Sequence, residues 1–133
     1  MYKVFLFFAI VAAAAGLGIN CRGSSYCRDG SDIQKIKSYM DGLIDENREY
    51  NSGENIVCYR AGENVASGYC LFLQDNKTPV KGGQIFSLLN ALIDHGCKGC
   101  GSVPVDWENS NDPSVNGILT VNYVGATGCE GLC

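Results

Sequence analysis

The chain has 133 residues, and 10 lysines and arginines against 14 aspartates and glutamates give it a net charge of −4. Binding to nucleic acid or to anionic membranes depends on a positive surface, so this charge argues against both classes of partner. The length suits one domain, and the sequence shows no internal repeat, low-complexity tract or linker.

Residues 1–16 predict a secretory signal peptide. Lys3 supplies a short positive start, and the apolar run VFLFFAIVAAAA from Val4 to Ala15 is shorter than the roughly 20 residues of a membrane-spanning helix. Small residues close the segment, so we expect cleavage after Gly16. The mature domain is then residues 17–133, and the protein is expected to be secreted and extracellular.

All eight cysteines follow this segment. An even number of cysteines in a small secreted chain predicts four structural disulfides, because the compartment is oxidising and the core is modest. Eight cysteines can pair in many ways, so the count leaves the connectivity open. The motif CKGC at Cys97–Cys100 lacks both the thioredoxin-like context of a redox dithiol and the second cysteine pair of a zinc site.

The first regular element is a predicted helix that begins near Ser31, in SDIQKIKSYMDGLIDENREY. Ser31 and Gln34 have the spacing of a capping box. One stripe of the helix is apolar: Ile33, Ile36, Met40, Leu43 and Ile44. The opposite face is charged and is expected to be solvated: Lys35, Lys37, Asp41, Asp45 and Glu49.

NIVCYR and VASGYCLFL are two strands of a predicted hairpin, since both segments are rich in β-branched and aromatic residues. Gly68 inside the second segment indicates a bulge or a close neighbour. A second helix is predicted for QIFSLLNALIDHG, where His95 lies in the last turn and Gly96 provides a left-handed stop. Between these elements, Asn76–Thr78 forms a glycosylation sequon that Pro79 weakens.

SVPVDW is expected to be a short edge strand, because Pro104 cannot donate a hydrogen bond in a central position. ENSNDPSVNG is expected to be a loop, and ILTVNYV (Ile118–Val124) a strand. The order helix, two strands, helix, one or two strands predicts an α+β class. We expect a disulfide-rich α/β sandwich, in which two helices pack on one face of an antiparallel sheet.

No catalytic constellation emerges from the sequence. The only histidine, His95, is expected to serve at the helix end. Carboxylate pairs can perform acid–base chemistry, but scattered acids are ordinary in an acidic chain. No Ser-His-acid set, phosphate loop or calcium loop is present. We therefore predict a binding protein that is not an enzyme and uses no cofactor or metal. The acids considered were Asp41, Asp45 and Glu49 in a row, and Asp106 and Glu108 beside Trp107.

Three motifs in order, LGINCRGSSYC, DHGCKGCGS and LTVNYV, resemble the killer toxin family of the smut fungi (killer protein four). The resemblance covers Leu17–Cys27 almost residue for residue and then Leu88–Val124, and it is weaker between Arg28 and Gln84. It implies a secreted toxin that arrests the growth of competing fungal or plant cells by blocking calcium uptake through channels. The implied partner is a membrane calcium channel or another cell-surface protein, and we expect a monomer.

The resemblance also implies a disulfide pairing that ties the N-terminal segment to the end of the second helix. The implied bridges join Cys21 to Cys97, Cys27 to Cys100 and Cys58 to Cys129, which leaves Cys70 and Cys133 for the fourth. The resemblance leaves open whether Cys129 and Cys133 exchange these two partners.

The chain departs from the family at a position implicated in activity. Two positions before the cysteine that matches Cys58, the basic family toxin has a lysine, and this acidic chain has Ile56. A channel entrance lined with carboxylates would favour an incoming cation. Arg60, two residues after Cys58 and hence on the same strand face, is the first candidate for target binding. The other candidates are Lys77, Lys81 and Lys98.

An alternative hypothesis is a non-toxic secreted effector or binding module that engages a host or competitor protein. Charge separates the two hypotheses. A basic spot around Arg60 favours the channel hypothesis, whereas a uniformly acidic surface favours the alternative.

Overall fold

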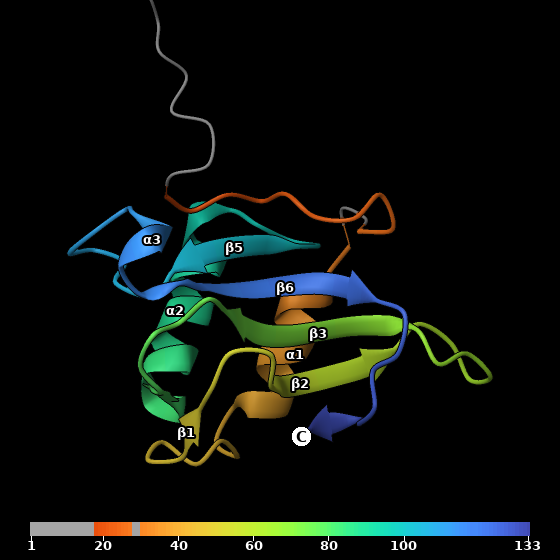
Figure 1. Ribbon diagram of the computed structural model, residues 1–133. Helices are drawn as coiled ribbons and strands as arrows, with labels where there is room; N and C mark the ends of the chain where they lie inside the picture. Colours follow the sequence, from red (N-terminus) through yellow and green to blue (C-terminus); the bar gives the residue numbers. More distant parts are fainter. Residues whose placement is uncertain (1–17, 28–29) are drawn as a thin grey trace, which may run out of the picture.

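The computed structural model describes residues 18–27 and 30–133, so the predicted signal peptide lies outside the described residues (Figure 1). Among the described residues, no helix is both long enough and apolar enough to cross a bilayer. The elements are α1 (Asp32–Met40), β1 (Glu49–Tyr50), β2 (Asn55–Arg60), β3 (Gly68–Gln74), β4 (Val80–Lys81), α2 (Gly82–His95), β5 (Gly101–Pro104), α3 (Pro113–Asn116), β6 (Ile118–Val124) and β7 (Gly131–Leu132).

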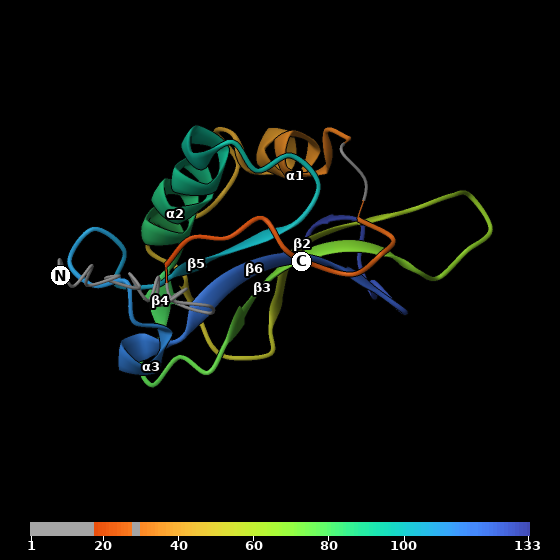
Figure 2. The same cartoon turned by 90° about the horizontal axis from the view of Figure 1, so that it is seen from above.

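Five strands form one antiparallel sheet in the order β5-β6-β3-β2-β7, and β1 pairs with β4 in a separate small sheet. Helices α1 and α2 lie together on one face of the large sheet (Figure 2). This arrangement confirms the predicted α+β class with two helices on one face. The predicted loop before β6 contains the short helix α3, whose first turn is capped by the Asp112 carboxylate accepting from the Ser114 N–H.

Helix α1 is shorter than its apolar pattern predicts. Asp41 already has extended backbone angles, and Gly42 follows at φ +71°, a left-handed conformation that favours glycine. Leu43 is therefore 68% exposed instead of joining the buried stripe. The predicted row of acids on the helix face is wrong for the same reason, since Asp41, Asp45 and Glu49 all follow the end of the helix.

The predicted capping box is also wrong. The side chain of Ser31 makes no capping hydrogen bond. Instead, the next residue, Asp32, accepts a hydrogen bond from the phenol of Tyr59 in β2. This contact ties the first turn of α1 to the sheet.

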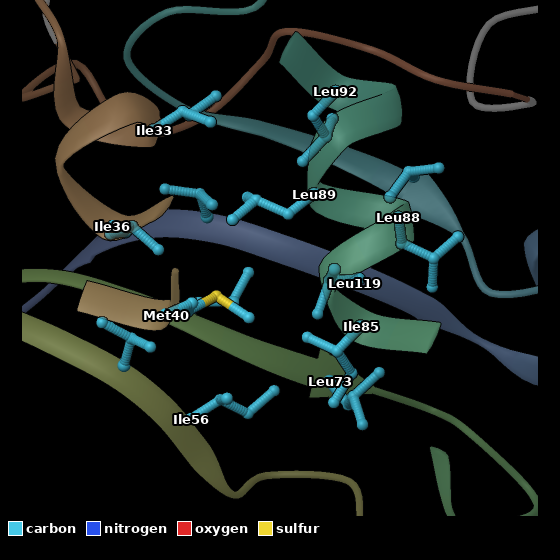
Figure 3. Packing of buried hydrophobic residues seen from close by; sticks show 14 of the residues in the cluster. Ile33, Ile36, Met40, Ile56, Leu73, Ile85, Leu88, Leu89, Leu92 and Leu119 are labelled. Atoms are coloured by element: carbon cyan, nitrogen blue, oxygen red, sulfur yellow. The ribbon is translucent and has the colours of Figure 1, made fainter. Parts of the chain in front are cut away.

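Helix α2 ends as predicted. Gly96 has φ +99°, and its N–H donates to the carbonyl of Ile93 at 3.0 Å. The buried side chains of α1 and α2 meet those of the sheet in one core (Figure 3). Its labelled members are Ile33, Ile36, Met40, Ile56, Leu73, Ile85, Leu88, Leu89, Leu92 and Leu119.

Strands β2 and β3 form the predicted hairpin, and β5 is an edge strand of the five as Pro104 predicts. On the outer side of β5, the backbones of Asn20 and Ser102 exchange two hydrogen bonds of 3.0 and 2.8 Å. Gly68 has a close neighbour, because a Cβ there would lie 2.1 Å from the carbonyl oxygen of Tyr59. Any larger residue would force the hairpin apart at this pair.

Two disulfides join the N-terminal segment to the end of α2, and they agree with the resemblance. Cys21 pairs with Cys97 and Cys27 with Cys100. These two bridges and the Asn20–Ser102 pairing fix the segment along the sheet edge at several points.

The other two implied bridges are wrong. The hairpin register places Cys58 directly opposite Cys70, with a Cα–Cα distance of 4.2 Å, and these two residues form a disulfide. Cys129 pairs with Cys133, four residues further along the chain. The sulfur atoms of Cys58, Cys129 and Cys133 lie within 4.8 Å of one another, so the expected partner is close to Cys58. Cys58 nonetheless forms its disulfide with Cys70, the residue directly opposite it in β3.

Loop length predicts unequal contributions from these disulfides. Replacing both Cys27 and Cys100 with serine should lower the free energy of unfolding by about 4 kcal/mol, because the bridge spans a sequence separation of 73 residues. Replacing Cys129 and Cys133 should cost about 2 kcal/mol, because they are 4 residues apart. Urea unfolding of the two double variants measures the difference. Equal losses would contradict this expectation.

Candidate target-binding site

Arg60 is the last residue of β2 and lies where the chain leaves the sheet for the loop 61–67. The N–H of Ala61 donates to the carbonyl of Ser67 at 2.9 Å, which closes the loop at its base. Residues 61–66 are all exposed, and the loop projects from one end of the molecule (Figure 1). The Arg60 side chain, 51% exposed, therefore stands at the base of a prominent projection.

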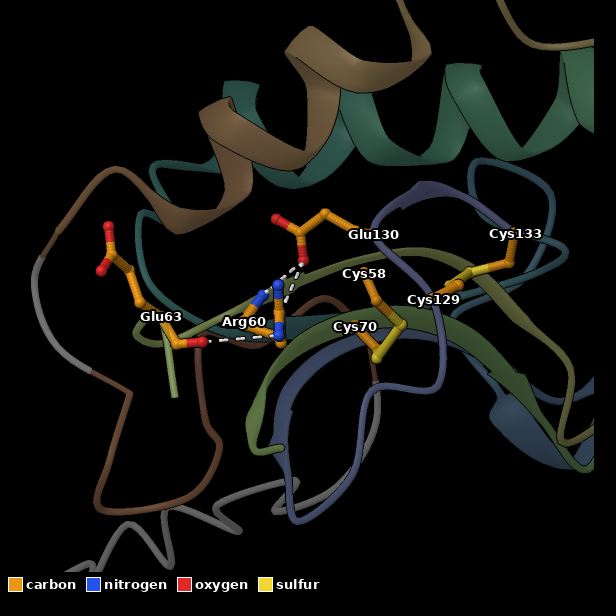
Figure 4. Close-up of polar contacts among 7 residues, drawn as sticks. All are labelled: Cys58, Arg60, Glu63, Cys70, Cys129, Glu130 and Cys133. Atoms are coloured by element: carbon orange, nitrogen blue, oxygen red, sulfur yellow. Dashed lines mark hydrogen bonds and ion pairs between the residues drawn. A yellow bond between two sulfur atoms is a disulfide. The ribbon is translucent and has the colours of Figure 1, made fainter. Parts of the chain in front are cut away.

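Glu130 shares the charge of Arg60. Its Oε2 lies 3.8 Å from Nε of Arg60 and accepts a 3.0 Å hydrogen bond from the Arg60 backbone N–H (Figure 4). The guanidinium also donates to the carbonyl of Glu63 at 3.5 Å. An exposed pair of this kind contributes about 0–1 kcal/mol, so a partner carboxylate can displace Glu130 at little cost.

A hollow of about 430 Å³ lies beside this ion pair. Arg60 and Glu130 supply its charged groups, and Ala66 and Ala126 supply small apolar wall residues. A volume of this size is in the range of ligand sites and accommodates a side chain from a partner protein.

The three candidate lysines do not gather around Arg60. Lys77 follows the opposite end of β3, where its ammonium donates to the carbonyl of Ser114 at 2.9 Å. Lys81 in β4 lies opposite Glu49 of β1 in the register of the small sheet. Lys98 follows α2, and its carbonyl accepts from the N–H of Ile33. All three are exposed, but they lie on separate parts of the fold and do not form one cationic patch with Arg60.

The residues with side chains suited to catalysis or metal binding do not form one site either. His95 is exposed in the last turn of α2. Asp106 and Glu108 lie in the turn after β5. Within residues 18–27 and 30–133, the single group of three potential metal ligands is Cys58, Cys129 and Cys133. All three are in disulfides, whereas a metal requires thiolate ligands.

A cluster of five tyrosines, which the sequence did not predict, lies next to Arg60. Tyr59, Tyr69 and Tyr123 are directly paired across β2, β3 and β6, and the rings of Tyr26 and Tyr39 extend the row at its two ends. Lys35 of α1 places its ammonium 4.3 Å from the centroid of the Tyr59 ring. No local spacing could reveal the cluster, because its members come from five segments. The period-two positions of Tyr59, Tyr69 and Tyr123 within their strands were the available signal.

Burial raises the pKa of the Tyr59 phenol far above its usual value, and the hydrogen bond to Asp32 raises this pKa further. Burial also raises the pKa of Tyr50 in β1. Both phenols therefore stay protonated through the physiological range, and Tyr59 acts there as a donor to the Asp32 carboxylate.

Comparisons with known proteins reveal a relative of similar length. The Kp4 family profile matches residues 4–125. The KP4 killer toxin of Ustilago maydis P4 virus is 32% identical over 126 residues, which cover 93% of this chain and 93% of that protein. This chain belongs to the Kp4 family. Membership of a killer toxin family supports a toxin-like function for the chain.

The Kp4 match ends before Cys129 and Cys133. The two misassigned bridges thus involve the part of the chain that follows the matched segment. The two correctly implied bridges, of Cys21 and Cys27, lie entirely inside it.

Ile56 lies in an irregular part of β2. The β2–β3 register shifts between Asn55 and Val57, which leaves Ile56 in a bulge without a partner residue in β3. Ile56 is 0% exposed and lies in the core near Met40 (Figure 3). Arg60 shares the face of Cys58, as alternation predicts, but Ile56 points to the opposite face. Arg60 therefore does not replace a side chain at position 56 geometrically.

A lysine at position 56 is expected to destabilise the protein instead of restoring a cationic site. Ile56→Lys would bury an ammonium without a partner, and we expect it to lower the free energy of unfolding by at least about 3 kcal/mol. Ile56→Val is the control and should cost about 1 kcal/mol, because it removes one buried methylene group. Urea unfolding measures both losses, and a stable lysine variant would contradict the buried position.

The raised pKa of Tyr59 predicts a loss of stability in alkali. A phenol whose folded pKa lies above its unfolded value of about 10 contributes stability that is complete below that pH and is lost as the pH rises above it. Tyr59→Phe should therefore flatten the fall in unfolding free energy above pH ~10. Urea titrations at a series of pH values measure this slope. An unchanged slope in the variant would show that Tyr59 does not cause it.

Proposed function

We propose that the chain is a secreted toxin that inhibits the growth of competing fungal or plant cells by blocking calcium uptake through a cell-surface channel. Membership of the Kp4 family supports the toxin-like part of this proposal. The single observation that carries the site is Arg60, a half-exposed cation at the base of a projecting loop on an acidic protein. A guanidinium so placed can enter a channel entrance lined with carboxylates.

We infer that the protein acts by binding as a monomer, without catalysis, cofactor or metal. Four disulfides, two of which clamp the N-terminal segment, support a rigid binding surface that loses little conformational entropy on association. Secretion follows in this proposal from the predicted signal peptide of residues 1–16 and from the disulfide content.

A specific observation favours a second candidate function. Glu130 shares the charge of Arg60, and the candidate lysines are dispersed, so no strong basic spot surrounds Arg60. A non-toxic effector that engages a host or competitor protein through the hollow beside Arg60 fits this weaker charge. Growth assays separate the two candidates.

Purified, oxidised mature protein is expected to stop the growth of sensitive fungal cultures or plant seedlings, and excess calcium should restore growth. Arg60→Glu should lower the potency by tenfold or more, on the order of the effect of removing one binding hot spot. Arg22→Glu is the matched control, because it makes the same charge reversal at an exposed arginine of the N-terminal segment. Glu130→Gln should increase the potency, since it removes the competing carboxylate.

Each outcome has a definite meaning. Growth arrest that calcium does not relieve would indicate a toxin with another target. Equal losses from Arg60→Glu and Arg22→Glu would remove Arg60 as the binding residue. Absence of inhibition in every species and dose tested would support the non-toxic effector.

A further inference from the structure

Four tyrosines, one each from β2, β3, β6 and the N-terminal segment, surround a depression that shares Arg60 with the proposed site, but whose rings the proposed function does not use. Tyr59 pairs with Tyr69 and Tyr69 with Tyr123 across the sheet, with ring centroids 5.3 and 5.6 Å apart. Tyr26 stacks on Tyr123 with a centroid distance of 4.8 Å and is 61% exposed. We call this depression, of about 390 Å³, the tyrosine pocket; it is lined by Tyr26, Asp32, Lys35, Tyr59, Arg60, Ala61, Tyr69 and Tyr123.

The rings of the tyrosine pocket are held in place before any ligand arrives. The phenol of Tyr69 donates to the carbonyl of Tyr26 at 2.7 Å. The disulfide of Cys27 to Cys100 anchors the residue that follows Tyr26. The side chain of Asn122 also accepts a 2.9 Å hydrogen bond from the N–H of Ser24. A preformed aromatic surface loses little entropy when a ligand binds.

The charged groups around the pocket nearly balance. The Asp32 carboxylate accepts from the Tyr59 phenol, and the Lys35 ammonium lies 4.3 Å from the centroid of the same ring. Arg60 adds a second cation, but Glu130 shares its charge. The pocket thus presents both donors and acceptors without a strong net charge.

This combination narrows the class of ligand. An anion would have to approach Asp32 and Glu130 as well as the two cations. An apolar peptide would strip water from Lys35, Asp32 and Arg60 without replacing their hydrogen bonds, which is costly. A neutral sugar meets both demands, since its hydroxyls donate and accept while its C–H face stacks on a ring. The pocket wall combines four aromatic rings with three charged side chains, and its volume lies in the range of small-ligand sites.

We propose that the tyrosine pocket binds a neutral, β-linked oligosaccharide of a cell surface. β-Linked glucose and N-acetylglucosamine units carry equatorial substituents and present flat C–H faces, which suit the exposed face of Tyr26 and the half-buried rings beside it. Binding would hold the protein at a cell wall, and the inference does not depend on whether a channel is the final target.

Isothermal titration of the oxidised mature protein with laminarihexaose and with chitohexaose tests the proposal and distinguishes a β-glucan source from a chitin source. We expect one of the two to bind. Tyr26→Ala should weaken binding by about tenfold, because it removes the most exposed stacking ring. Tyr26→Phe keeps the ring and should retain binding. Tyr123→Ala, which removes the ring beneath Tyr26, should also weaken it.

Phe86→Ala is the matched control. Phe86 is a half-buried ring beside a lysine, with Lys37 Nζ 5.8 Å from its centroid, and it lines a different depression of about 340 Å³ between α2 and the segment that follows α1. This variant should bind as the parent does. Thermal unfolding confirms that each variant is folded.

Three results would overturn the proposal. The first is that neither hexasaccharide binds the folded parent protein. The second is that binding is unchanged in both Tyr26→Ala and Tyr123→Ala. The third is that dextran sulfate binds while the neutral sugars do not, since that would identify an anion site. Growth inhibition and its dependence on calcium are measured separately, so either proposal can fail without the other.

Discussion

The antiparallel register of β2, β3 and β6 is the constraint on which both candidate surfaces depend. The same register pairs Cys58 with Cys70, places Tyr59, Tyr69 and Tyr123 in one row, and sets Arg60 opposite Gly68 at the end of the hairpin. A shift of one residue would move every side chain of a strand to the other face. The close approach of Gly68 to the Tyr59 carbonyl and the Cys58–Cys70 bridge hold the hairpin in this register.

The N-terminal segment completes the structure around this sheet. Its two bridges to the end of α2 and its pairing with β5 extend the edge and bring Tyr26 onto Tyr123. Without that segment, the tyrosine row would end at β6. The long-range disulfides thus serve a surface as well as stability.

The charges of the protein weaken the attraction of the Arg60 site for a target. The protein is acidic, and Glu130 partly neutralises its most prominent cation. A target must therefore offer a carboxylate that competes with Glu130 for Arg60, or additional contacts in the hollow beside it. The adjacent tyrosines offer such contacts over a larger area, since rigid aromatic side chains commonly dominate binding interfaces.

The amino-acid sequence by itself determined the α+β class, both long helices, the hairpin and β6, because their hydrophobic periodicity and the stop at Gly96 are local properties. It misjudged the end of α1, where Gly42 leaves the helix although the apolar pattern continues to Ile44. It did not reveal the two-residue strands β1, β4 and β7, which are too short to carry a pattern.

Only the tertiary structure decided which side chains meet. These contacts involve segments that are separated in the sequence. They include the bulge that buries Ile56 and the bonding of Cys58 to Cys70 instead of Cys129. They also include the contact of Glu130 with Arg60 and the cluster of five tyrosines. Such contacts depend on strand register and chain closure, and neither property is encoded by any short stretch of residues.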